Sequence, residues 1–359
     1  MSEACSLFDH AVQLHQRSPD VPLPHEGMPY PDAAAHPPNR RLQPDDQRRQ
    51  GADVAVVLDA YFADSASTPS ELVQAFHDVA VPIHHNEHIA AAALRADRHR
   101  VQQTGRWLVR HSTDQCSVIV GLALLATDWA AEDVPLIKTI GLLSKTFGPL
   151  AARALRRRDG GAEALVWLAE RSSGWGRVYV IEALCEVAAP KSREWLLRNA
   201  CDGDFLNAYF AGEVATAAYL HEAITRADAD DALVDHTGRL LNTMTFSSGM
   251  GTRLDHYPST ARVLEAHAGH LGRQAPSVRR YIDAARIADY LARPSPAQPL
   301  GTIDRPDLVV RQYTTVLDRP DWCAAARAGF AGDGDFPHRD YRSWFVENTA
   351  RRLKLKAFA

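Results

Sequence analysis

The 359-residue sequence has few cysteines, little strand-like alternation and no long hydrophobic run. Its five cysteines are scattered and never form a Cys-x-x-Cys pair, which favours a reducing compartment over a disulfide framework. The longest apolar stretch, residues 116–126, is shorter than the roughly 20 residues of a membrane helix. A basic segment followed by an apolar run, the mark of a secretory signal, is absent from the first residues. We therefore expect a cytoplasmic protein without a membrane partner.

An excess of positive charge is also lacking, since 40 Lys and Arg stand against 44 Asp and Glu, for a formal net charge of −4. This balance disfavours a nucleic-acid partner and leaves it possible only through a local basic patch. The sequence has no Gly-x-Ser-x-Gly elbow and no Walker phosphate loop. It identifies no catalytic residue and no cofactor, and a non-enzymatic role is favoured.

The chain divides by composition into four parts. Residues 18–50 hold eight of the 21 prolines without apolar periodicity, so we expect residues 1–52 to form a largely irregular arm. Residues 53–292 carry helical signals, including a capping box at Thr68–Glu71 and an apolar stripe at Leu136, Ile140, Leu143 and Phe147. A proline-rich connector is expected over 293–306 and a C-terminal helical cap over 307–359. The sequence predicts an all-α protein.

Two internal correspondences indicate repeats. In the shorter frame, Ile137, Ile140 and Leu143 map at one constant offset onto Val178, Ile181 and Leu184. In the longer frame, the segment 106–120 maps onto 166–180, with Trp107 over Trp167. The shorter frame matches helix-pair repeats of about 40–47 residues. The sequence alone leaves both frames open.

The segments GWGRVYVIEAL (174–184) and APSVRRYIDAARIADYL (275–291) resemble the second helix of HEAT repeats. Residues 83–291 as a whole resemble bacterial proteins of the HEAT/armadillo-like α-helical repeat class. The abundance of Arg and Ala is typical of a GC-rich bacterial genome. The resemblance implies a right-handed α-solenoid of antiparallel helix pairs, with a concave face that binds other macromolecules and a C-terminal helical cap.

Candidate binding residues surround the Gly-Trp-Gly sequence at 174–176, which we interpret as a helix-to-helix corner. Trp175 is either a wedge against the next repeat or a binding hot spot, with Glu170, Arg171 and Arg177 around it. Arg106 and Arg110, in the segment 106–120 that maps onto 166–180, are further candidates. A positive inner face along Arg106, Arg110, Arg153 and Arg177 would favour nucleic acid.

A histidine-rich segment at 82–100 is the candidate metal site. If it is helical, His84 and His88 lie one turn apart and can share one ion, with a third ligand supplied by another helix. The order of residues differs from the His-Glu-x-x-His motif of zinc proteases. A solvent-exposed helix flank is the alternative interpretation.

Three functional hypotheses follow. The first is a non-enzymatic scaffold that binds a protein or peptide through its concave face. The second is a HEAT-like DNA-binding protein or a DNA glycosylase that acts on alkylated bases, as the repeat resemblance allows. The third is a metal-dependent enzyme at His84 and His88.

Overall fold

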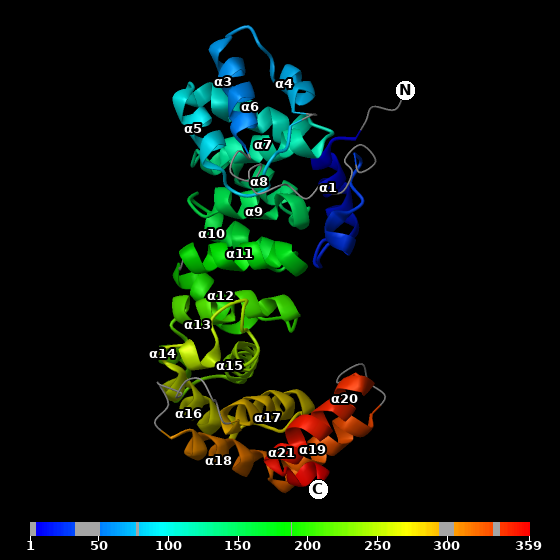
Figure 1. The fold of residues 1–359 in the computed structure, drawn as a ribbon, viewed down its shortest axis with the longest axis vertical. Coiled ribbons are helices and arrows are strands. Elements are labelled where there is room, and N and C mark those ends of the chain that lie inside the picture. The colour runs from blue at the N-terminus through cyan, green and yellow to red at the C-terminus, as the bar shows by residue number, and fades with distance from the viewer. Residues whose placement is uncertain (1–4, 33–50, 77–78, 188, 294–304, 333–337) are drawn as a thin grey trace. The chain divides into compact units, whose positions relative to one another are not determined.

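The computed structural model describes residues 5–32, 51–76, 79–187, 189–293, 305–332 and 338–359. Within these ranges the chain forms helices and no strands, which confirms the all-α prediction (Figure 1). None of the helices described is both long and apolar enough to cross a bilayer. The chain divides into two compact units, residues 1–192 and 193–359, and the boundary falls inside α12 (Pro190–Asn199).

Unit 1 is built from helices that alternate between two layers. Its helices after the N-terminal segment are α3 (Ala52–Ala63), α4 (Pro69–Ala75), α5 (Glu87–Arg95), α6 (Arg98–His111), α7 (Gln115–Leu125), α8 (Val134–Ile140), α9 (Ser144–Leu155), α10 (Gly161–Ala169) and α11 (Gly174–Val187). One layer contains α5, α7, α9 and α11, each packed on the next, while α6, α8 and α10 form the other. In α7 nearly every residue is buried, so its apolar composition comes from its place between neighbouring helices.

This packing decides between the two repeat frames. The longer frame places α6 onto α10 and α7 onto α11, and the members of each pair lie in the same layer. The shorter frame places α8 onto α11, which lie in different layers. The shorter frame therefore matches the apolar faces of two helices without matching their positions in the structure.

The Gly-Trp-Gly sequence forms the corner between α10 and α11. Gly174 has a φ of +55°, in the left-handed region that favours glycine, and α11 begins there. Gly176 lies where α11 approaches α9, so close that an added Cβ would stand 2.2 Å from the side chain of Ser144. Val178, Ile181 and Leu184 are buried on the inner face of α11.

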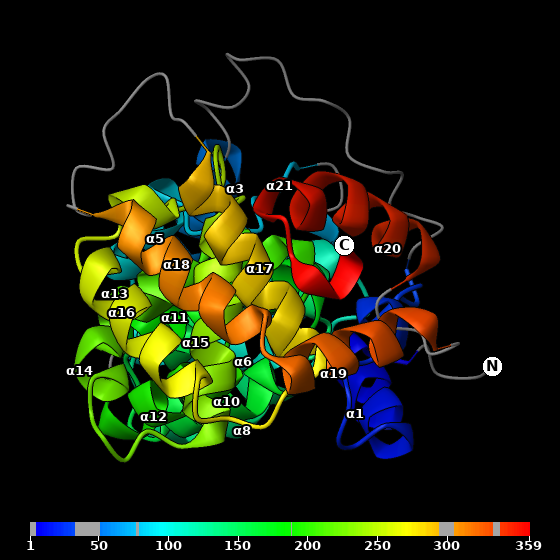
Figure 2. The ribbon, with the colours of Figure 1, turned by 90° about the horizontal axis from the view of Figure 1, so that it is seen from below.

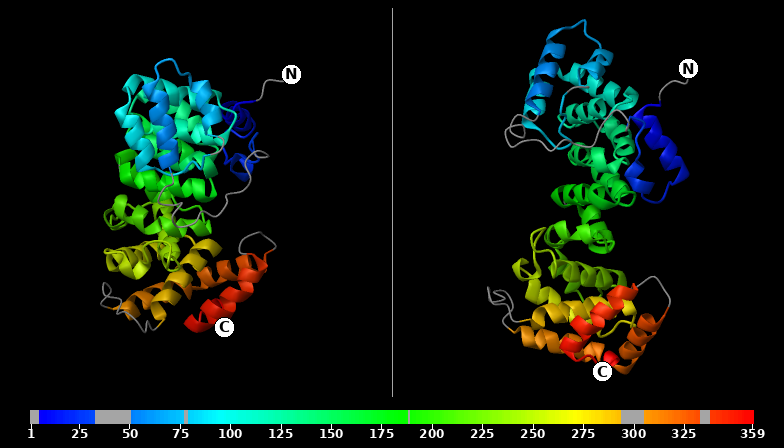
Figure 3. Two further views of the ribbon diagram at one scale, coloured as in Figure 1. Left: turned by 45° about the horizontal axis from the view of Figure 1, so that its top comes forward. Right: turned by 45° about the vertical axis from the view of Figure 1, so that its right-hand side comes forward.

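The N-terminal segment, for which we expected a largely irregular arm, contains an α-helix. Residues 7–17 form α1 (Leu7–Arg17), capped by Ser6, whose hydroxyl accepts from the backbone N–H of Asp9. α1 packs against α6 and α8, along the flank of unit 1 (Figure 3). Its apolar stripe of Leu7, Phe8 and Ala11 is short and precedes the proline-rich run, so composition alone hid it. The remainder of the expected arm, residues 33–50, lies outside the described residues.

Unit 2 repeats the two-layer arrangement. Its main helices are α13 (Ala211–Ala217), α14 (Leu220–Ile224), α15 (Asp231–Met244), α16 (Thr260–Leu271), α17 (Val278–Ala292), α18 (Pro306–Leu317), α19 (Pro320–Ala331), α20 (Arg339–Phe345) and α21 (Arg351–Leu353). α13, α15 and α17 pack in sequence, and α14, α16 and α18 do the same. α18 lies along α17, which α19 also contacts (Figure 2). The expected boundary between a repeat domain and a cap at 293–306 thus separates helices that share one core, and most of that connector, residues 294–304, lies outside the described residues.

Candidate functional sites

The first candidate site is the surface of unit 1 that holds the N-terminal segment, residues 5–32. Backbone contacts fix both ends of this segment, because the N–H of Leu7 donates to the carbonyl of Ser112 at 3.1 Å and the N–H of Gln115 donates to Asp32 at 2.7 Å. Between them, the hydroxyl of Tyr30 lies 3.5 Å from the carbonyl oxygen of Leu143. The segment therefore packs along the flank of the helical layers.

Two of the predicted binding arginines contact this segment. The guanidinium of Arg171 donates to the carbonyl of Pro19 at 2.7 Å and pairs with Asp20 at 3.2 Å. It also stacks on the ring of Trp167 at 4.6 Å. The guanidinium of Arg110 lies 4.2 Å from the ring centroid of Phe8, on the buried face of α1. A main-chain carbonyl, an acid and an aromatic ring of the segment are thus recognised by the surface.

The segment is held in an unusual conformation beside the corner of α10 and α11. His25, Glu26 and Gly27 all have positive φ, at 49°, 56° and 85°, and the first two side chains rarely adopt that region. Oε1 of Glu26 is buried next to Gly174 and has no hydrogen-bond partner among the described residues. Both features oppose the bound conformation, so the surface holds the segment against local strain.

The remaining predicted residues at the corner have different environments. Trp175 is 41% exposed and stacks on Tyr179 with ring centroids 6.1 Å apart. Glu170 pairs with Arg171 at 3.3 Å. Arg177 is only 7% exposed, and its guanidinium donates to the carbonyl of Ala169. Trp175 and Glu170 face solvent beside the bound segment, whereas Arg177 holds the corner from inside.

Arg106 and Arg110 also line a hollow between α6 and α8, together with Trp107 and Leu136. Arg106 forms ion pairs with Asp133 and Glu132. These pairs raise the pKa of the Arg106 guanidinium, with the hydrogen bond to Asp133 as the main cause. Its charge is compensated within the chain.

The expected helical pair of His84 and His88 is wrong in its geometry. α5 begins at Glu87, where the side chain of Asn86 accepts from the N–H groups of His88 and Ile89. His84 therefore lies in the preceding loop, edge-on to the ring of Tyr179 at 5.3 Å, and burial lowers its pKa. Among the residues that the structure describes, no three His, Cys, Asp or Glu gather as a metal site.

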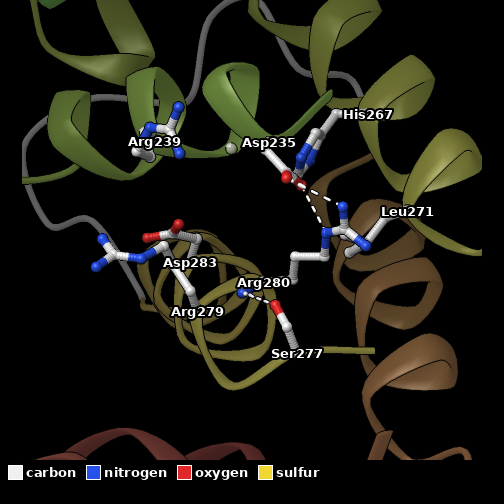
Figure 4. Close-up of a pocket in the computed structure, with 9 residues that line it drawn as sticks. Asp235, Arg239, His267, Leu271, Ser277, Arg279, Arg280 and Asp283 are labelled. Carbon is white, nitrogen blue, oxygen red and sulfur yellow. Dashed lines mark hydrogen bonds and ion pairs between the residues drawn. The ribbon is translucent and has the colours of Figure 1, made fainter. Parts of the chain in front are cut away.

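The second candidate site is a cleft in unit 2 that our sequence analysis missed. It has a volume of about 210 Å³ and lies where α15 and α17 face each other. Arg239 and Asn242 project from α15, and Arg279, Asp283 and Arg286 project from one face of α17. Figure 4 shows a neighbouring pocket that shares Arg239, Arg279 and Asp283 with this cleft, and there Arg280 pairs with Asp235. The sequence does contain one sign of this site, the spacing of Arg279, Asp283 and Arg286 at i, i+4 and i+7, which places the three side chains on one helix face.

The floor of this cleft has polar groups with incomplete hydrogen bonding. The side-chain amide of Asn242 donates to Asp283 at 2.7 Å. Burial raises the pKa of the Asp283 carboxyl to about 6, against the opposite effects of that hydrogen bond and of Arg239, Arg279 and Arg286. The side-chain oxygen of Asn242 and Nε of Arg239 are buried without a hydrogen-bond partner among the described residues. The floor of the cleft thus contains an acceptor and a donor that these residues leave unused.

We expect Asp283→Asn to stabilise the protein at pH 7.5 by up to about 3 kcal/mol. The pKa of Asp283 is higher in the folded chain than the value of about 3.9 of an unfolded aspartate, so ionisation disfavours folding. The stability that protonation supplies is complete below about pH 4 and is lost as the pH rises through about 6.

Urea unfolding of the wild type and of Asp283→Asn from pH 4 to 8 checks this expectation. The difference in their free energies of unfolding should vanish near pH 4. A loss of stability in the variant at pH 7.5 would contradict it.

In comparisons with known proteins, no family model, curated protein or solved structure matched the chain. Both sites are therefore interpreted from their own geometry.

Proposed function

We propose that the chain is a non-enzymatic HEAT-like α-solenoid whose first unit binds a peptide segment of a partner protein. One observation carries this proposal. Arg110 and Arg171, which the sequence analysis named as binding candidates, contact residues 5–32 of the same chain. The two-layer packing of helices in each unit supports the solenoid part of the proposal.

The bound segment indicates which peptide chemistry the surface takes. Leu7, Phe8 and Ala11 place an apolar helix face against α6 and α8. The chain then extends past Arg171, which takes a main-chain carbonyl and an acid. A partner segment of this kind has a short amphipathic helix followed by an extended acidic stretch. It would bind in exchange for residues 5–32.

Exchange can be measured on the full chain with a labelled synthetic peptide of residues 5–32. In the wild type, the tethered segment competes at a high effective concentration, so the added peptide binds poorly. We expect the double substitution Leu7→Ala with Phe8→Ala to loosen the tethered segment and tighten peptide binding about tenfold or more, because two buried side chains are truncated.

Val21→Ala is the matched control, because Val21 belongs to the same segment and is exposed. Adding Arg171→Ala to the loosened variant should weaken peptide binding again. If the loosened variant keeps its helix content and does not bind the peptide, the proposal is wrong.

The nucleic-acid hypothesis in its original form receives less support from this unit. It relied on Arg106, Arg110, Arg153 and Arg177 as one positive face. Arg106 is paired with two carboxylates and Arg177 is buried. Unit 1 therefore favours a peptide over a polyanion.

A further inference from the structure

The cleft of unit 2 continues outward into a row of planar side chains. Phe205 is 64% exposed and stacks on Phe246, with ring centroids 6.1 Å apart and an interplanar angle of 12°. The guanidinium of Arg286 lies 5.9 Å from the ring of Phe246 and 5.1 Å from that of Trp344, which is 39% exposed. Tyr341 follows, 5.7 Å from Trp344. We call Phe205, Phe246, Arg286, Trp344 and Tyr341 the stacking row.

Positive charge lies directly beside the stacking row. Arg239, Arg279 and Arg286 line the same cleft, with carboxylates at Asp283 on the floor and Asp204 at the rim. Asp204 is already used as a helix cap, because its side chain accepts from the N–H of Leu206 at 2.7 Å. Arg286 belongs to both features, so an anionic group and a planar ring can bind next to each other.

We propose that this cleft and the stacking row bind a segment of single-stranded nucleic acid. Exposed rings at Phe205 and Trp344 offer faces to unpaired bases, while the arginines take phosphates. The floor of the cleft is polar, with the side-chain oxygen of Asn242 and Nε of Arg239 lacking a hydrogen-bond partner among the described residues. Because ligand contact here lies within unit 2, the proposal is independent of peptide binding by unit 1.

The geometry favours a single strand over the other anionic ligands. A duplex keeps its bases stacked inside and presents no faces to aromatic side chains. A free mononucleotide carries one base and would leave part of the row without a ligand ring, since Phe205 stacks on Phe246 while Trp344 contacts Arg286. An acidic peptide would pair with the arginines and make no use of the parallel rings.

The test is fluorescence anisotropy of a labelled 12-mer of thymidylate with the full chain. We expect salt-sensitive binding, and we expect Phe205→Ala combined with Trp344→Ala to weaken it about tenfold or more, as loss of base stacking predicts. Arg286→Gln should weaken binding and reduce its salt dependence. Trp129→Ala is the control, because Trp129 is an exposed tryptophan in unit 1 and should leave affinity unchanged.

Several results would overturn the proposal. These are no binding of the 12-mer, equal affinity for the matching duplex or for thymidine monophosphate, and an equal loss in the Trp129→Ala control. Trp344→Phe keeps an aromatic face, so it should bind within about threefold of the wild type even if the double alanine variant folds poorly. A loss in Trp344→Phe as large as in the alanine variant would also contradict stacking.

Discussion

Replacing Arg158 with alanine is expected to lower the free energy of unfolding of unit 1 by about 3–5 kcal/mol. Arg158 is 5% exposed. Its guanidinium donates to the carbonyls of Ala130 at 3.1 Å and Leu125 at 2.7 Å, and it also reaches the carbonyl of Ala154. Its removal would leave these buried carbonyl oxygens without their donor. It would also take a cation from beside Asp133, 3.9 Å away.

Arg157→Ala is the matched control. Arg157 is exposed and lies 5.9 Å from the ring of Trp129, so its loss should change stability by less than about 0.5 kcal/mol. Hydrogen exchange of the amides in α7 and α9 confines the measurement to unit 1, since a two-unit chain need not unfold in one step. Equal effects of the two substitutions would show that Arg158 is not the buried donor described.

Replacing Gly176 with valine is expected to destabilise unit 1 by about 3 kcal/mol. A Cβ at this position would lie 2.2 Å from the Ser144 side chain and 3.0 Å from its backbone carbon. Gly148 of α9 faces the same crossing, where an added Cβ would lie 3.4 Å from Cα of Gly176. α9 and α11 would have to separate to admit the larger side chain, and contacts along both helices would be lost.

Gly269→Ala tests whether the effect comes from packing or from the loss of a glycine. Gly269 lies within α16, and an added Cβ there meets nothing within 4 Å. This change should be neutral or stabilising by up to about 1 kcal/mol, because alanine favours the helix. Thermal and urea unfolding of both variants provide the comparison, and a neutral Gly176→Val would refute the close crossing.

Local sequence determined where some helices of this protein begin. The expected single-helix stripe of Leu136, Ile140, Leu143 and Phe147 is divided in the structure, because α8 ends at Ile140 and α9 begins at Ser144. The capping box at Thr68 and Glu71 does start α4, because it depends only on residues three positions apart. The same reasoning placed a corner at Gly174.

The environment of the charged side chains was decided by the tertiary structure. Arg157 and Arg158 are neighbours with equivalent local sequence, yet one faces solvent and the other is surrounded by the carbonyls of Leu125, Ala130 and Ala154. The predicted residues Arg106, Arg171 and Arg177 likewise have three different environments: the first is ion-paired, the second contacts the N-terminal segment and the third is buried.

The cleft of unit 2 shows most clearly that the tertiary structure decides the environment of charged side chains. Arg239 and Asn242 belong to α15, whereas Asp283 and Arg286 belong to α17, with α16 between them in the chain. Each helix alone presents an ordinary polar face. Only their packing brings the carboxyl, the amide and the guanidinium groups into one cavity and removes enough water to raise the pKa of Asp283. Periodicity within the sequence fixes which face of a helix is buried, whereas the partner across that face is set by contacts between distant residues.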